Sequence, residues 1–194
     1  MSANVIRKVV YAAVSVVLLT GSLMASSPKN PPDTVAVQAT AWDFQKEASD
    51  LLGETRLLSI KLRVDADQLE SYTRSKLSWQ SHGDQLTRVK EHINEMDGWL
   101  ERLQEIRHVA SPWQQQAIDR IVPVAVEIAS RTQAAIEHLN DNRDYLFAPT
   151  YTDHLSTIAE RAGTLNDSAK TFVEYGKTQE KLDQLGEKLE IRAS

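Results

Sequence analysis

The chain has 194 residues, with 22 lysines and arginines against 27 aspartates and glutamates, and it contains no cysteine. This length predicts one domain, and a composition of 41% hydrophobic and 25% charged residues is that of a folded chain, not of a disordered tail. Without cysteine, the sequence excludes a disulfide framework, a thiolate metal site, cysteine-linked haem and a thiol nucleophile.

The N-terminal segment has the layout of a secretory signal peptide over residues 1–26. Arg7 and Lys8 are followed by an uncharged, largely apolar run over residues 9–25, and small residues surround the end of that run. The alternative is an uncleaved membrane anchor formed by residues 5–25, since a run of about 17 residues is at the lower limit of a membrane span. Both interpretations predict an exported protein, periplasmic or extracellular.

The mature chain is predicted to be acidic. The signal segment carries two basic and no acidic residues, so its removal changes the net charge of −5 to about −7. Nucleic acid is therefore excluded as a partner, because phosphate contacts need clustered lysine and arginine. Contact with a membrane is expected only through residues 5–25, if they are retained.

A proline-rich linker is predicted over residues 27–38, which hold three of the six prolines and show no helical pattern. From Ala39 the pattern changes, because apolar residues recur at steps of three and four and so share one helical face. This stripe contains Phe44, Ala48, Leu51, Thr55, Leu58, Leu62, Ala66 and Leu69. The other side of the helix carries i,i+4 pairs of opposite charge, which indicate an exposed surface.

Capping signals mark the next two helices. The second helix is predicted from about His82 to Val109, with Ser81 as its N-terminal cap. Its apolar seam contains Leu86, Val89, Ile93, Met96, Leu100 and Leu103. The third helix starts at Ser111-Pro112-Trp113-Gln114, where a serine cap precedes a proline at the first helical position and a glutamine can close a capping box. Its stripe contains Ala117, Ile121, Val124, Ile128, Ala135 and Leu139.

The fourth helix is predicted over residues 150–190, and its stripe begins with Leu155, Ile158, Ala162, Leu165, Ala169 and Phe172. Four amphipathic helices with short turns predict an all-α fold, an up-down-up-down antiparallel four-helix bundle over residues 39–194. The spacing of about 3.5 residues on each face favours coiled-coil-like packing. The full prediction is this bundle, preceded by the N-terminal signal peptide.

The fourth helix is longer than the second, so its end is predicted to project beyond the bundle. At 1.5 Å per residue the second helix is about 42 Å long and the fourth about 60 Å. The projecting part keeps Leu182, Leu185 and Leu189 on one stripe, which makes these leucines the candidate interaction surface. Either residues 34–37 fold back over them, or the same segment of a second molecule covers them. We favour self-association, because heptad spacing suits a coiled coil.

The five histidines form no recognisable metal or haem site. Glu105 and His108 give one copy of a Glu-x-x-His motif that di-iron bundles use twice. His92 and Met96 are four residues apart, a spacing that could offer soft ligands to copper or haem. A core methionine next to a boundary histidine explains the same spacing, so we predict no metal and no cofactor.

No catalytic residue can be assigned from the sequence. It contains no nucleophile elbow, no His-Glu-x-x-His zinc motif, no glycine-rich phosphate loop and no EF-hand loop. The carboxylates are abundant but lie on predicted outer faces beside basic neighbours. The prediction is a protein that is not an enzyme.

Aromatic residues are predicted to gather at the two ends of the bundle. Trp42 and Trp113 fall at one end, and the other end receives Tyr72, Trp79, Tyr145, Phe147 and Tyr151. We expect these side chains to close the ends of a long core, and a ligand cavity is the alternative.

The sequence as a whole predicts an exported, non-enzymatic helical-bundle protein of the bacterial cell envelope. It would act through protein–protein interaction, with a protein partner or with a second copy of itself. The alternative is a periplasmic bundle that binds a ligand or a metal.

Overall fold

The computed structural model describes residues 34–75 and 77–193, so the predicted signal peptide and the first part of the predicted linker lie outside the described residues. Four long helices account for most of that part of the chain: α2 (Thr34–Ser71), α3 (Trp79–Ile106), α4 (Pro112–Asp141) and α5 (Pro149–Ala193). Two short 3-10 helices, η1 (Tyr72–Arg74) and η2 (Arg107–Val109), follow α2 and α3. The described residues form no strand, and the predicted all-α fold of four packed helices is confirmed.

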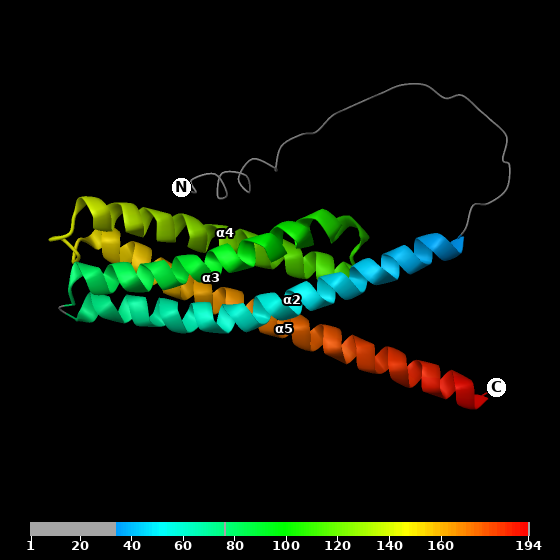
Figure 1. Ribbon diagram of the computed structural model, residues 1–194. Coiled ribbons are helices and arrows are strands. Elements are labelled where there is room, and N and C mark those ends of the chain that lie inside the picture. The colour runs from blue at the N-terminus through cyan, green and yellow to red at the C-terminus, as the bar shows by residue number, and fades with distance from the viewer. Residues whose placement is uncertain (1–33, 76, 194) are drawn as a thin grey trace, which may run out of the picture.

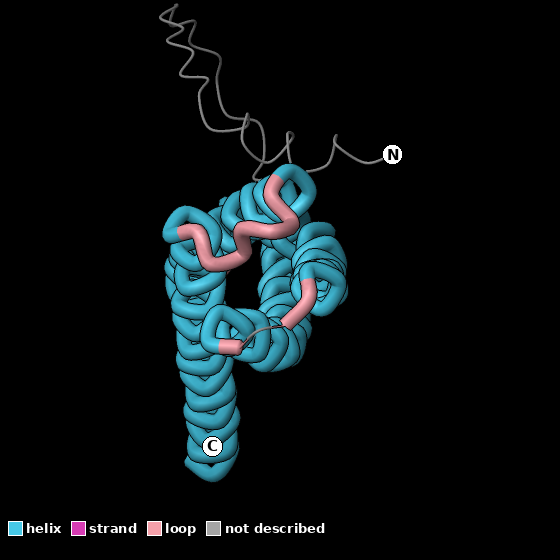
Figure 2. The backbone as a smooth tube through the Cα atoms, turned by 90° about the vertical axis from the view of Figure 1, so that its left-hand side faces the viewer, coloured by secondary structure: helices cyan, strands magenta, loops and turns pink. Residues whose placement is uncertain are grey.

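The four helices run alternately in opposite directions around one core (Figure 1). Each helix packs against its neighbours in the chain, and α2 also packs against α5, which closes the ring of helices. Figure 2 shows this ring from the end that carries two of the three connections. The core residues recur at steps of three and four on every helix, and among the fully buried ones are Leu52, Leu62, Leu86, Leu103, Ile121, Ile128, Leu155 and Leu165.

Two of the predicted helix starts are wrong. Helix α2 begins at Thr34, so residues 34–38 belong to the helix and not to the linker. All three linker prolines precede Thr34, and nothing after them opposes a helix. Helix α3 is capped by Ser78, whose hydroxyl accepts the backbone N–H of Ser81 at 3.4 Å. The chain is extended at Ser78, whereas Ser81 already lies within the helix.

The predicted start of the third helix is confirmed. Helix α4 opens with Pro112 at its first position, directly after Ser111. The side chain of Gln114 reaches back, and its Oε1 accepts the backbone N–H of Ser111 at 2.9 Å. These local contacts fix the point at which the chain turns from α3 into α4. They place Trp113, the second residue of α4, beside α2 and α5.

The two ends of the bundle differ. At one end, η1 and the connection from α4 to α5 close the core, whereas at the other end α2 and α5 diverge like the arms of a fork (Figure 1). The N-terminal arm belongs to α2 and the C-terminal arm to α5. Residues 34–37 continue α2 along its own arm, away from α5. They therefore do not fold back over the end of α5, which was one of the two predicted ways to cover it.

Candidate functional site

The predicted interaction surface lies on the C-terminal arm of the fork. Leu182, Leu185 and Leu189 are exposed by 55%, 56% and 67% respectively. Their spacing of three and four residues puts them on one side of α5. Every residue over 181–189 is exposed, so no described part of the chain covers this leucine stripe.

Trp113 fills the point where the two arms separate. Its indole lies against the backbone of α5 at Gly176, where an added Cβ would come within 2.6 Å of Trp113 Cη2. The ring also meets that of Tyr175 edge-on, with 5.9 Å between centroids. Trp113 thus lies at the end of the bundle where it was predicted, whereas the side chain of Trp42 is outside the described part of the structure.

A second exposed apolar stripe lies on α2 and was not anticipated. Leu57, Ile60 and Val64 are exposed by 55%, 44% and 61%, at spacings of three and four. The spacing of these three apolar residues is visible in the sequence. It was overlooked because Lys61 and Arg63 lie among them, on the side of the helix that was predicted to carry charge pairs. An apolar stripe on an outer face is a marker of protein–protein contact.

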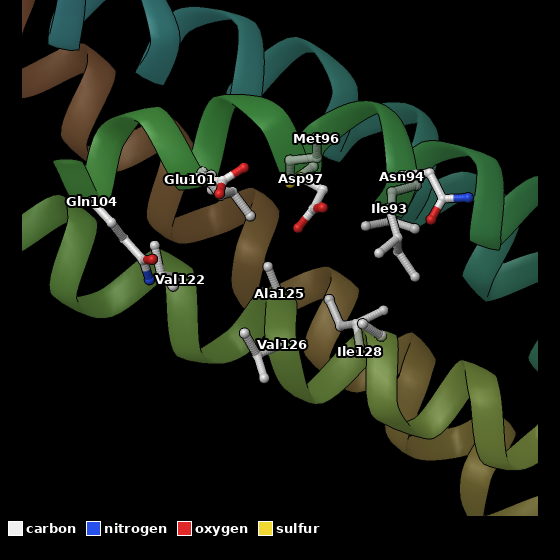
Figure 3. Close-up of a pocket in the computed structure, with 13 residues that line it drawn as sticks. Ile93, Asn94, Met96, Asp97, Glu101, Gln104, Val122, Ala125, Val126 and Ile128 are labelled. Carbon is white, nitrogen blue, oxygen red and sulfur yellow. The ribbon is translucent and has the colours of Figure 1, made fainter. Parts of the chain in front are cut away.

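A narrow groove runs between α3 and α4 (Figure 3). Apolar side chains of both helices form its walls, and Leu62 of α2 contributes to its base. The α4 wall consists of small and branched residues, namely Val122, Ala125, Val126, Ile128 and Ala129. The water-accessible volume is about 40 Å³, enough for a few water molecules.

The α3 wall of this groove carries two carboxylates. The side chain of Asp97 points into the space between the helices (Figure 3), and Glu101 follows one turn later. Burial raises the pKa of the Asp97 carboxyl above its ordinary value, and the negative charge of Glu101 raises it further. The carboxylates were all predicted to lie on outer faces of the helices. For Asp97 that prediction is wrong, because its side chain lines the groove.

At the closed end of the bundle a cluster of aromatic and histidine side chains joins three helices. Tyr151 of α5 is fully buried, and its hydroxyl lies 3.0 Å from Nδ1 of His82 on α3, a hydrogen bond whose donor depends on the imidazole tautomer. The ring of His138 on α4 stacks on Tyr151 with centroids 5.2 Å apart. Tyr72 meets His82 edge-on at 5.4 Å.

The aromatic residues of this end therefore divide into two groups. Tyr151 and Tyr72 pack at the end of the core, as predicted. Trp79, Tyr145 and Phe147 are exposed by 37%, 72% and 60%, so the expectation that these three help to close the core is wrong. The loop after α4 carries Tyr145 and Phe147 past the end of the bundle, beyond the core.

Acidification is expected to destabilise the bundle through this cluster. Burial lowers the pKa of His82 below its ordinary value of 6.5, and burial followed by the charge of Arg131 lowers that of His154. These imidazoles bind protons more readily in the unfolded chain, so their contribution to stability is complete above about pH 6.5 and is lost as the pH falls below it.

Urea unfolding at about pH 7.5 and about pH 5 measures this effect. The midpoint should fall on acidification in the parent protein and fall less in His82→Gln. His108→Gln is the matched control, because His108 is exposed, and it should behave as the parent does. Equal falls in the parent and in His82→Gln would show that His82 does not contribute.

The histidines singled out from the sequence have structural partners. His92 Nε2 lies 2.8 Å from Oδ2 of Asp65, and Oδ1 of Asp65 accepts the side-chain amide of Gln85 at 2.9 Å. His108 Nδ1 lies 3.0 Å from the backbone oxygen of Glu105. Met96 is buried in the core. Among the side chains that the structure describes, no three of histidine, aspartate or glutamate come together as metal ligands.

Comparison of this chain with protein families, with curated proteins and with solved structures finds no match. Among the helices of the described region, none combines the length and the apolar character needed to cross a bilayer.

Proposed function

We propose that the protein is an exported, non-enzymatic, coiled-coil-like helical bundle of the bacterial cell envelope that acts through protein–protein contact. The observation that carries this proposal is the exposed leucine stripe, Leu182, Leu185 and Leu189, on a helix that extends beyond its own core. The signal-peptide pattern of residues 1–26 supports export to the periplasm or to the outside of the cell. Retention of residues 5–25 would instead leave the bundle anchored at the membrane surface.

The partner that we propose for the leucine stripe is the same segment of a second copy. A single helix that projects into water is marginally stable, and burial of its leucines in a coiled coil would stabilise it. In a coiled-coil heptad lettered a to g, Leu182 and Leu189 take the a positions and Leu185 takes the d position. Lys181 and Lys188 then occupy g positions, which flank the apolar seam. An antiparallel pair would bring Lys181 near Lys188 of the other copy, whereas a parallel pair places Lys181 near Gly186. The charges therefore favour a parallel pair.

Sedimentation velocity of the mature protein and of a version that stops after Gln179 tests this proposal. Side chains from Lys181 to Leu189 make no core contact, so the shortened bundle should fold with unchanged helix content up to Gln179. We expect the mature protein to dimerise and the shortened protein to be monomeric. Serine at Leu57 and Ile60 is the control, and it should leave the dimer intact. Loss of the dimer in that control would place the contact on α2 instead.

A periplasmic ligand-binding bundle is the second candidate, and the groove between α3 and α4 favours it. An absorbance spectrum and native mass spectrometry of the protein purified from its host distinguish the two functions. A bound small molecule at one copy per chain would support ligand binding, and a ligand-free dimer would support protein–protein contact.

A further inference from the structure

Asp97 lies between two apolar residues on the side of α3 that faces α4. It lies four residues after Ile93 and three before Leu100, so helical spacing turns all three toward the same neighbour. Ile93 and Leu100 line the groove between α3 and α4, and Asp97 lies between them with its carboxylate in the groove (Figure 3). A charged side chain therefore lies between two apolar ones in the groove between α3 and α4.

The part of the chain that the structure describes offers this carboxylate no partner. None of its hydrogen bonds or ion pairs involves Asp97 or Glu101. The facing residues Val122, Ala125 and Val126 have no side-chain donor, and the amides of Asn94 and Gln104, which also line the groove, are not bonded to either carboxylate. The nearby arginine on α3, Arg102, is bound to Glu47 and Glu105. A partly buried charge without a partner is costly, and a carboxyl group held in a groove with a shifted pKa is a candidate for a binding site.

We propose that the groove between α3 and α4 binds a small organic cation with an apolar body, such as a primary alkylammonium. The ammonium group donates hydrogen bonds to the Asp97 carboxylate, with Glu101 as a second negative charge one turn away. The carbon chain lies along Val122, Ala125 and Val126. This inference rests on the second candidate function, ligand binding in this groove, and names its ligand class; it is independent of the leucine stripe on α5.

The chemistry of the groove selects this ligand class over others. An anion would meet two carboxylates, and a neutral alcohol could donate only an uncharged hydrogen bond to Asp97, which is weaker than the charge-assisted bond from an ammonium group. A divalent metal needs six or more oxygen ligands for calcium, or an octahedral set for magnesium, and the apolar α4 wall supplies none. The narrow opening favours an unbranched chain over a ring.

The fold also allows this groove to open. Helices α3 and α4 pack less extensively against each other than the other adjacent helices do. The α4 wall includes two alanines, Ala125 and Ala129, beside the branched Val122, Val126 and Ile128. The space already present is water-sized, so an alkyl chain would enter as the two helices separate.

Three probes of equal chain length test the proposal: n-hexylammonium, 1-hexanol and hexanoate. Isothermal titration and ¹H–¹⁵N correlation spectra of the full mature protein measure affinity and location. We expect n-hexylammonium to bind about tenfold more tightly than 1-hexanol, since a charge-assisted hydrogen bond is added, and hexanoate not to bind. Amide shifts should centre on Asp97, Leu100, Ala125 and Ala129.

The variant Asp97→Asn keeps the shape of the side chain and removes its charge. It should reduce the affinity for n-hexylammonium about tenfold and leave that for 1-hexanol unchanged. Because it removes an unpaired carboxylate, it should fold at least as stably as the parent. Glu95→Gln, an exposed position on the same helix outside the groove, is the matched control and should bind as the parent does.

Several results would overturn the proposal. Equal affinities for the alcohol and the ammonium would show that Asp97 is not a ligand. So would equal behaviour of Asp97→Asn and Glu95→Gln, amide shifts confined to α2 and the end of α5, or no binding of any probe.

Discussion

Replacement of Tyr151 by alanine should lower the free energy of unfolding by about 3–5 kcal/mol. Tyr151 is among the largest fully buried side chains, and it contacts His82 of α3 and His138 of α4 from its own position on α5. Its removal leaves a cavity where three helices meet. A typical domain has a stability of about 5–15 kcal/mol, so this one change should remove a large share of it.

Tyr151→Phe separates the packing from the hydrogen bond. It retains the ring and removes only the hydroxyl that pairs with His82 Nδ1, so we expect a loss of about 1–3 kcal/mol. Urea unfolding followed by circular dichroism measures both variants. If Tyr151→Ala lowers the free energy of unfolding no more than Tyr151→Phe does, the ring does not stabilise the core as its burial indicates.

Replacement of Gly176 by alanine should destabilise the protein by about 1–3 kcal/mol, although alanine is the better helix former by about 1 kcal/mol. The new methyl group would meet the Trp113 ring at 2.6 Å and force α5 or the indole to move. Gly163→Ala is the matched control. Gly163 is also inside α5, and a Cβ there meets nothing within 4 Å, so alanine should stabilise by up to about 1 kcal/mol.

A double variant identifies the cause. In a Trp113→Ala background the obstacle is absent, so Gly176→Ala should become neutral or stabilising. Destabilisation of the same size in both backgrounds would mean that the loss at Gly176 does not come from contact with Trp113.

The fold could be predicted where the information is local. Ser111, Pro112 and Gln114 specify the start of α4 through contacts among neighbours, and the structure has them as expected. The apolar stripes predicted four packed helices, since periodicity depends only on which residues face one another along a helix. The cap of α3 was placed three residues late, because Ser78 and Ser81 are both good caps and their backbone conformations decide between them.

The candidate sites depend on contacts between helices, and sequence reasoning found them only in part. The exposed leucines of α5 followed from comparing helix lengths. The groove did not, because the position of Asp97 matters only when the apolar α4 wall opposite is known. Likewise His92 has a spacing that could suit a metal, but its partner is Asp65, 27 residues away on another helix. The spacing of residues along one helix does not show which residue of a neighbouring helix lies opposite.

The closure of the bundle by α2 against α5 has a consequence for biosynthesis. The first and last helices of the described chain share one core, so an emerging chain lacks one side of that core until α5, the last 45 residues of the described chain, has been made. Pairings so distant in the chain form late and slow the folding of a domain. A nascent chain of this topology therefore stays open during most of its translation, the state in which an unfolded polypeptide can be threaded through a narrow pore.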